Sequence, residues 1–244
     1  MVTTIFLGPI PIQVWGLFVA VGIVVAVMIA VRRAPRVGIA PQVVQDVSVG
    51  ILIAGFVGAR LGHVLWYEPA FYFAAPIEIV KFWNGGLSSF GGFLAATIAG
   101  ILLVRRRGIS LLRFSDCIVR ALPFGFLIGR LGCHVTRMHP GPMGSGIFFF
   151  PFPDGLMRLD LGLLESLLWM LIAAPAMLVD RRDAHPGRTS ALVVGSYAVG
   201  RFVLDFWRAE DMRYAGLTPA QYGCVALLGI AVALWWFERS RRNS

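Results

Sequence analysis

The sequence predicts an all-α polytopic membrane protein with about seven transmembrane helices. Of its 244 residues, 57% are hydrophobic and only 14% are charged, and the mean hydropathy is +0.75. A soluble domain of this length does not need so much apolar sequence. The apolar residues gather in runs of about 20, the length that a helix needs to cross a bilayer. We therefore expect a single integral-membrane domain over residues 1–244.

Seven runs of the required length follow one another along the chain. The first carries no charge, and Pro9 and Pro11 mark its lead-in at the membrane interface. The third begins within the glycine-rich stretch WNGGLSSFGG. An apolar, Gly- and Pro-rich segment, 138–161, follows the fourth and is expected to rest at the interface. The runs are residues 10–31, 47–66, 87–104, 114–136, 162–179, 189–207 and 217–237.

The distribution of arginine predicts the orientation of these spans. Lys81 is the only lysine among the 22 basic residues, and most arginines follow the first, third, fifth and seventh runs. This division among loops argues against nucleic-acid binding. Cytoplasmic loops are enriched in Arg and Lys, so we expect the N-terminus outside and the C-terminus in the cytoplasm. The arginines on the expected cytoplasmic side are Arg32, Arg33, Arg36, Arg105, Arg106, Arg107, Arg113, Arg181, Arg182, Arg188, Arg239, Arg241 and Arg242.

Four further arginines lie within the expected spans: Arg60, Arg120, Arg130 and Arg201. A charge at the centre of a span costs about 2.5 to 3.5 kcal/mol on insertion scales, so each needs a partner or a watery cavity. Snorkelling or ion pairing is one account, since Asp116 precedes Arg120 by four residues and Asp205 follows Arg201 by four. Arg60, Arg130 and Arg201 all fall in the outer half of the bilayer in the expected topology, whereas Arg120 falls in the inner half. Guanidinium groups suit phosphate oxygens, so we interpret these three as an anion-binding cavity open to a phospholipid head group.

Glycines flank two of these arginines, in the stretches GARLGHVLWY (58–67) and GRLGCHV (129–135). Small residues allow helices to pack closely, and they equally allow a ligand to approach the backbone. The sequence leaves both readings open.

Six motifs together resemble one known family. In order along the chain they are IQVWGLFVAVG, GARLGHVLWYEP, WNGGLSSFGGFL, PFGFLIGRLG, GSYAVGRFVLDFWR and LTPAQYG. Their order and spacing are similar to those of the prolipoprotein diacylglyceryl transferases, which are multi-pass enzymes of the bacterial cytoplasmic (inner) membrane.

The resemblance implies a reaction and its partners. Members of the family move the diacylglyceryl group of phosphatidylglycerol onto the thiol of a lipobox cysteine in a preprolipoprotein, the first step of lipoprotein maturation. The implied partners are phosphatidylglycerol, the signal peptide and the membrane, with a site that faces the outer leaflet. The scheme needs no cofactor and no metal.

The resemblance also implies roles for individual residues. Arg130 and Arg201 match the arginines of the family's G-R-x-G-N and Y-G-x-x-R-F stretches, and Tyr197 matches the tyrosine of the second stretch. These three are the expected catalytic residues. The expected substrate-binding residues are Arg60, Gly85, Gly86, Ser88, Ser89, Gly91, Gly92, Gly129, Gly132, Gly141, Glu165 and Asp205, the last a Glu in the family.

Four positions depart from the family pattern. Phe90 stands where the family has a functional histidine, Cys133 where it has the Asn of G-R-x-G-N, Met138 where it has a Glu, and Trp15 where it has a Tyr. The family's H-P-S-Q-L-Y-E segment reads LDLGLLE at 159–165. Phenylalanine cannot accept a proton. The histidines on the expected outer side, which are possible replacements, are His63, His134 and His139.

Two classes of function therefore remain open. The first is a divergent transferase that works without the motif histidine. The second is a non-catalytic or repurposed paralogue that binds an anionic phospholipid or a lipoprotein signal helix. A transporter or channel is disfavoured, because the sequence has neither an inverted repeat nor a chain of acidic residues across the spans.

Overall fold

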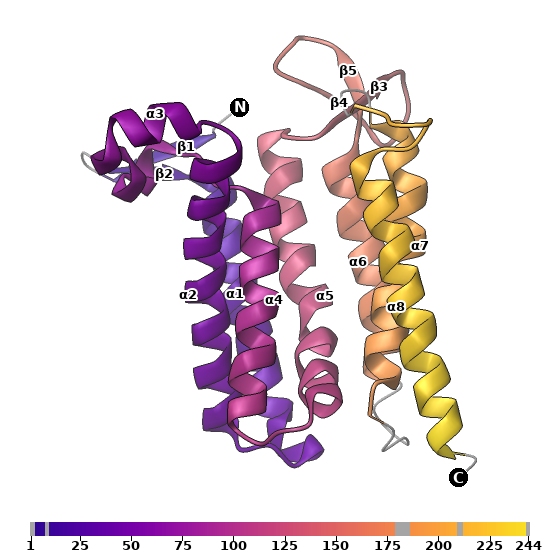
Figure 1. Cartoon of the computed structure of the whole chain (residues 1–244). Coiled ribbons are helices and arrows are strands. Elements are labelled where there is room, and N and C mark those ends of the chain that lie inside the picture. Colours follow the sequence, from indigo (N-terminus) through magenta and orange to yellow (C-terminus); the bar gives the residue numbers. More distant parts are fainter. Residues whose placement is uncertain (1–2, 8–9, 179–185, 209–211, 243–244) are drawn as a thin grey trace. The chain divides into compact units, whose positions relative to one another are not determined.

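The computed structural model describes residues 3–7, 10–178, 186–208 and 212–242 (Figure 1). Long helices coincide with all seven expected runs, so the helical reading is confirmed. Pro9, Arg181, Arg182 and the end of the fifth run fall outside the described residues. The long helices are α1 (Val14–Arg33), α2 (Pro41–Trp66), α4 (Ser89–Arg106), α5 (Leu111–Thr136), α6 (Leu161–Leu178), α7 (Arg188–Leu204) and α8 (Pro219–Arg242).

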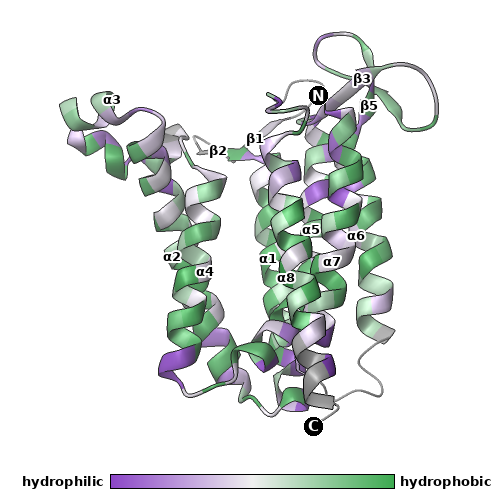
Figure 2. Cartoon of the chain, turned by 45° about the vertical axis from the view of Figure 1, so that its right-hand side comes forward, coloured by the Kyte–Doolittle hydropathy of each residue, from purple (hydrophilic) through white to green (hydrophobic). Residues whose placement is uncertain are grey.

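Among the residues that the structure describes, four stretches are long and apolar enough to cross a membrane: Val14–Val37, Pro41–Trp66, Ser89–Arg106 and Pro219–Trp236. Figure 2 shows the long helices mostly in the hydrophobic colour. Large apolar side chains lie on their outer faces, as at Ile53 and Phe93, whose exposed fractions are 60% and 64%. Apolar side chains directed outward along whole helices suit a lipid environment, and they indicate a membrane protein.

Two small sheets correct the expectation of an all-α fold. Strands β1 (Thr4–Leu7) and β2 (Ile10–Gln13) form an antiparallel pair, in register with Ile5 opposite Ile12. Proline lacks the backbone N–H that a helix interior needs, so helix α1 starts only after Pro11, at Val14. The segment expected to be a loop contains β3 (Pro140–Met143), β4 (Phe149–Pro151) and β5 (Met157–Asp160), in the order β3-β5-β4.

The chain divides into two compact units, Met1–Ala30 with Ser115–Ser244, and Val31–Phe114. In the second unit, α2 packs along α4. The approach is close because a Cβ on Gly91 would meet the carbonyl oxygen of Gly58 at 2.4 Å. The short helices of this unit are η1 (Ala34–Val37), α3 (Pro69–Ala74), η2 (Pro76–Val80) and η3 (Phe82–Asn84).

In the first unit, α7 packs against both α6 and α8. Trp169, Ile172 and Val193 form the centre of a buried apolar cluster between α6 and α7. The three-stranded sheet lies where α5 ends and α6 begins (Figure 1). This arrangement brings the last turns of α5 and α7 to the first turns of α6, where Glu165 and Arg201 face one another although they are 36 residues apart in sequence.

Asp116 and Arg120 attach the start of α7 to α5. The Asp116 carboxylate accepts hydrogen bonds from the backbone N–H groups of Gly187 (2.6 Å) and Ser190 (2.8 Å). Arg120 donates to the hydroxyl of Thr189. A carboxylate at a helix N-terminus satisfies N–H groups that have no partner within the helix. These buried charges therefore have a structural role at the beginning of α7.

Candidate functional site

Glu165 joins two of the expected arginines. Its Oε2 lies 2.6 Å from the Nε of Arg130, and its Oε1 accepts a hydrogen bond from Nη1 of Arg201. The carboxylate is fully buried, with an exposed fraction of 0%. Helices α5, α6 and α7 thus each contribute one charged side chain to a single cluster. The structure brings together residues that the sequence predicted one by one, without showing that they are in contact.

The cluster continues to a second carboxylate. Nη2 of Arg201 lies 2.7 Å from Oδ1 of Asp205, one helical turn further on, as the spacing predicts. Arg208 approaches the same oxygen at 3.7 Å. In this part of the molecule Arg130, Arg201 and Arg208 thus lie around two carboxylates, Glu165 and Asp205. Guanidinium groups in a water-poor environment favour contact with anionic oxygens.

The two arginines differ in how far they are enclosed. The side chain of Arg201 is 8% exposed and that of Arg130 is 22% exposed. Arg201 therefore has its charge satisfied mainly by protein groups, whereas Arg130 presents more of its surface. Arg130 is the better placed of the two to meet a phosphate first.

The LTPAQYG motif holds Asp205 in position, a role that we did not derive from its residues. Thr218 donates its hydroxyl to Oδ2 of Asp205. The Thr218 N–H donates to Oε1 of Gln221 (2.9 Å), and the Gln221 N–H donates to the Thr218 hydroxyl oxygen (3.1 Å). This reciprocal pair is a capping box at the start of α8. A Thr three residues before a Gln, ahead of an apolar run, was the signal available in the sequence.

Tyr197 belongs to an aromatic stack. Its ring lies 4.4 Å from that of Trp169 at an interplanar angle of 16°, and Trp169 stacks in turn on Phe126 at 4.7 Å. The stack fixes the tyrosine ring one turn before Arg201 on α7. It connects the same three helices that supply the charged cluster.

The expected glycines of this unit act on packing. A Cβ on Gly132 would meet Phe18 of α1 at 2.6 Å, and one on Gly129 would meet Val19 at 3.8 Å. One on Gly141 would lie 2.9 Å from the carbonyl oxygen of Leu159. Gly132 therefore lets α1 lie close to α5 near Arg130, and Gly141 lets β3 lie close to β5, whereas a Cβ at position 129 would make only an ordinary van der Waals contact.

Two of the positions that depart from the family pattern lie in contact. The Cys133 thiol lies near the side chains of Trp15 and Arg130. Cys133 is 4% exposed, so its thiol is enclosed by these neighbours. Met138, at a third departing position, is 49% exposed. The changes at 15 and 133 therefore alter one place, the surroundings of Arg130.

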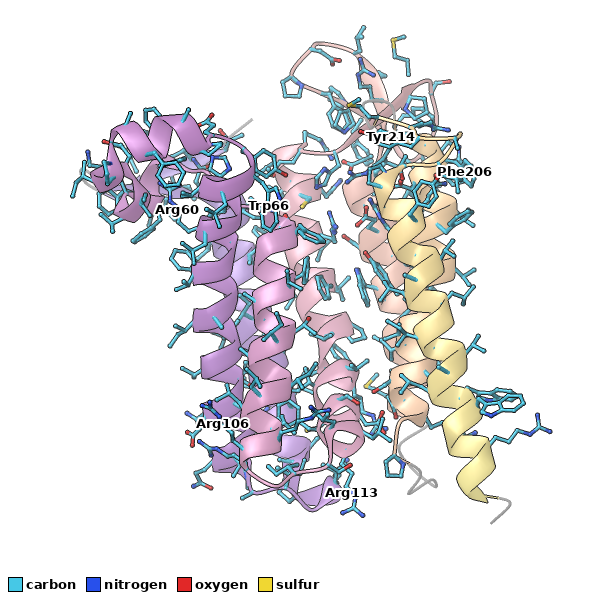
Figure 3. All side chains as sticks on the ribbon, in the orientation of Figure 1. Arg60, Trp66, Arg106, Arg113, Phe206 and Tyr214 are labelled. Carbon is cyan, nitrogen blue, oxygen red and sulfur yellow. The ribbon has the colours of Figure 1, made fainter. Side chains whose placement is uncertain are left out.

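Arg60 lies in the second unit, and its five hydrogen bonds all go to backbone carbonyl groups. Nε donates to Ile79 (2.9 Å), Nη1 to Gly85 (2.5 Å) and Gly86 (2.8 Å), and Nη2 to Glu78 (2.6 Å) and Lys81 (3.3 Å). A guanidinium group has five N–H donors, so all are used. Figure 3 shows Arg60 and Trp66 toward one end of the α2–α4 pair and Arg106 at the other. Its expected contact with substrate stays a prediction, while its bonds show that it organises the loop.

The stretch WNGGLSSFGG follows this loop into α4. Gly85 and Gly86 have φ values of 88° and 77°, a conformation that glycine adopts without strain. Ser88 caps α4, since its hydroxyl oxygen accepts from the Gly91 N–H at 3.3 Å, whereas Ser89 is exposed. Gly92, like Gly91, packs on α2.

Phe90 points outward from the first turn of α4. It is 67% exposed, and its ring meets Trp66 edge to face at 6.1 Å. A ring this exposed fills no core space. An imidazole at position 90 would therefore fit without leaving a cavity.

Two of the three candidate histidines have neighbours that restrict them. The ring of His63 fills the space over Gly86, where a Cβ would meet it at 2.6 Å, and stacks on Tyr67 at 5.2 Å. Nδ1 of His139 lies 3.4 Å from Nη2 of Arg208. His134 has a different environment, which is described below.

Together, apolar helices and a buried cluster of arginines and carboxylates define an integral-membrane protein with a charged site between three of its helices. The chain matches the prolipoprotein diacylglyceryl transferase family over residues 2–237. It belongs to that family.

Relatives with assigned names agree over nearly the whole chain. A phosphatidylglycerol–prolipoprotein diacylglyceryl transferase of Nitratidesulfovibrio vulgaris (strain DP4) is 31% identical, over 95% of this chain and 91% of the relative. Proteins of the same name from Azoarcus sp. (strain BH72) and Aromatoleum aromaticum are 30% and 29% identical. The alignments cover 94% and 93% of this chain, and 92% and 91% of these two relatives.

Proposed function

We propose that this chain transfers the diacylglyceryl group of phosphatidylglycerol to the lipobox cysteine thiol of preprolipoproteins. The observation that carries the proposal is the Arg130–Glu165–Arg201 cluster, in which one buried carboxylate holds both arginines and Arg130 stays 22% exposed. Cations help to bind the phosphate diester of the substrate, and they stabilise the phosphate group when it departs. Membership of the family indicates the class of reaction.

The chemistry is a displacement at carbon. The acceptor sulfur attacks the glycerol carbon that carries the phosphate ester, the carbon–oxygen bond breaks, and its electron pair remains on the phosphate of the leaving glycerol phosphate. Negative charge on that phosphate increases as the bond breaks. Guanidinium groups fixed beforehand stabilise this charge without reorganising.

The cluster is suited to such a change in charge. Glu165 and Asp205 hold the guanidinium groups in place before substrate arrives. A phosphate that meets the exposed face of Arg130 then adds a partner without displacing the carboxylate. Tyr197 lies one turn from Arg201 and completes the proposed catalytic group.

We further propose the setting of the reaction. Residues 1–244 form one integral-membrane domain with seven spans, the N-terminus outside and the C-terminus in the cytoplasm of a bacterium. The charged cluster then lies in the outer half of the inner membrane, open to the outer leaflet. Phosphatidylglycerol and the signal-peptide helix would reach it from the bilayer.

The test uses the full chain in vesicles that contain phosphatidylglycerol, with a lipobox peptide bearing one cysteine. Arg130→Ala and Arg201→Ala should each lower formation of diacylglyceryl peptide by about 10²-fold or more, the cost of losing one electrostatic stabiliser. Arg107→Ala is the control, since Arg107 pairs with the exposed Asp46. Unchanged transfer by both variants would rule out the assigned roles.

A binding paralogue is the second candidate, favoured by the loss of the motif histidine at Phe90. Complementation of a strain depleted of its own diacylglyceryl transferase separates the two. Rescue of growth establishes the transferase. A well-folded protein that binds phosphatidylglycerol vesicles and fails to rescue supports the paralogue.

A further inference from the structure

His134 lies in a charged group at the end of α5. Its Nδ1 is 2.8 Å from Oδ2 of Asp160, and Asp160 is 1% exposed. Arg137 donates to the same carboxylate and, at 3.0 Å, to the carbonyl oxygen of His134. The ring of Phe150 meets the imidazole edge to face at 5.1 Å.

These contacts occupy one of the two imidazole nitrogens, Nδ1. The Asp160 carboxylate lies against the Arg137 guanidinium. Nδ1 lies 2.8 Å from Oδ2 of Asp160 and 2.7 Å from Nη1 of Arg137. In the tautomer with its hydrogen on Nδ1, the ring donates to Asp160, while Nη1 of Arg137 donates to Asp160 and to the His134 carbonyl group. In the neutral ring Nε2 is left as an acceptor.

The backbone holds the parts of this group firmly. Asp160 also caps α6, since its Oδ1 accepts from the Leu163 N–H at 2.9 Å. Arg137 has a φ of 53° directly after α5, a left-handed conformation that often ends a helix. The N–H of the next residue, Met138, bonds back to the carbonyl oxygen of Cys133 at 3.2 Å. A carboxylate that fixes the tautomer and orientation of an imidazole is the arrangement that prepares histidine to accept a proton.

The group lies next to the charged cluster on the same two helices. His134 follows Arg130 by one turn of α5, and Asp160 precedes Glu165 at the start of α6. Residues four apart on a helix lie on one face, with Cβ atoms about 5–6 Å apart. Gly162 lets α6 lie close against α5 here, since a Cβ at this position would lie 2.9 Å from the backbone nitrogen of His134. The His134 side chain is 21% exposed and can be reached.

We propose that His134 is the base for the acceptor thiol, with Asp160 and Arg137 as positioning residues; the inference rests on the proposed function. The sulfur–hydrogen bond breaks as its proton passes to Nε2 of His134. The thiolate sulfur then forms the bond to the glycerol carbon, and the carbon–oxygen electron pair leaves on the phosphate beside Arg130. The imidazolium afterwards gives its proton to the departing glycerol phosphate or to water. His134 thus takes over the task of the imidazole that is missing at Phe90.

The experiment compares two acceptor peptides, one with the lipobox cysteine and one with selenocysteine at the same position. A selenol is ionised at neutral pH and needs no base. His134→Asn is the main variant, since its amide can still donate to Asp160. Asp160→Asn is the second, and His139→Asn is the matched control.

With the cysteine peptide, His134→Asn should transfer about 10²-fold more slowly than the wild type, the usual contribution of a positioned base. With the selenocysteine peptide the two rates should agree within a few fold. Asp160→Asn should show the same selective loss, and His139→Asn should show none.

Each contrary result has a distinct meaning. Equal rates for the wild type and His134→Asn with cysteine would show that His134 is not the base. An equal loss with both peptides would make His134 purely structural and also overturn the inference. No transfer by the wild type to either peptide would remove the proposed function itself, and the inference with it.

Discussion

The Nε atom of Arg130 lies 2.6 Å from a carboxylate oxygen of Glu165, and the other oxygen of that carboxylate accepts a bond from Arg201. One buried acid therefore organises both of the arginines proposed to bind phosphate. Removing one partner of a buried ion pair leaves an uncompensated charge, which costs far more than the intact pair contributes. The cluster should thus be sensitive to its central carboxylate.

We expect Glu165→Gln to destabilise the protein. Two guanidinium groups would lose their shared counter-charge, at a cost of about 3–5 kcal/mol. Unfolding in detergent micelles would measure this loss. The control is Asp46→Asn, which removes a 56% exposed partner of Arg107 and should cost less than about 1 kcal/mol. Equal stabilities for the two variants would contradict the central position of Glu165.

A second prediction concerns the contact between α5 and α6. Gly162→Ala places a Cβ 2.9 Å from the backbone nitrogen of His134 and 3.1 Å from the carbonyl carbon of Cys133, so one helix must shift. Overpacking of this kind costs about 1–3 kcal/mol. It should also slow transfer, because the charged cluster spans the same contact.

The matched control for that change is Gly229→Ala in α8. Nothing lies within 4 Å of the position that its Cβ would take. Alanine there should stabilise the helix by about 0.5–1 kcal/mol. If both substitutions change the unfolding temperature in the same direction, the close approach of α5 and α6 at Gly162 is wrong.

Arg60→Lys should loosen the loop that leads into α4. Lysine has three N–H donors on one nitrogen and cannot reproduce five bonds from a planar group. Loss of a hydrogen bond to a charged group costs about 1.5–3 kcal/mol. Hydrogen–deuterium exchange should therefore rise across residues 78–88. The exposed Arg106, substituted by lysine, should leave that exchange unchanged.

Phe90→His tests whether the family imidazole can be restored. Its exposed position should accommodate the ring, with a loss of only about 0.5–1.5 kcal/mol from the edge contact with Trp66. In the His134→Asn background, where the proposed base is missing, we expect transfer to the cysteine peptide to increase, by up to about the 10²-fold that an acid–base group supplies. Phe93→His, at a 64% exposed position on the same helix, is the control and should have no such effect.

Much of the fold could be read from local pattern. Apolar runs of the right length predicted each of the long helices, because a helix that meets lipid must be apolar over its length. The cost of a buried charge also predicted that the arginines within these runs have partners. For Arg201 the partner one turn away, Asp205, was correct, since four residues on a helix are neighbours whatever else surrounds them.

The two small sheets show where local pattern failed. Strands β4 and β5 lie in an apolar, proline-rich segment that was expected to be a loop, and their pairing depends on register between short pieces. Whether such short segments pair depends on which backbone groups of neighbouring segments are close enough to form hydrogen bonds. Neither alternation nor length signalled it in the sequence.

The sequence alone determined the membrane class, the helices, the arginines within them and the family. The tertiary structure decided what those charges do. It placed Glu165 between Arg130 and Arg201, gave all five donors of Arg60 to backbone carbonyl groups, and set Asp160 against His134. These partners are 18 to 36 residues apart in sequence. Hydrophobic periodicity reports which side of a helix is apolar and carries no information on which distant group will satisfy a buried charge.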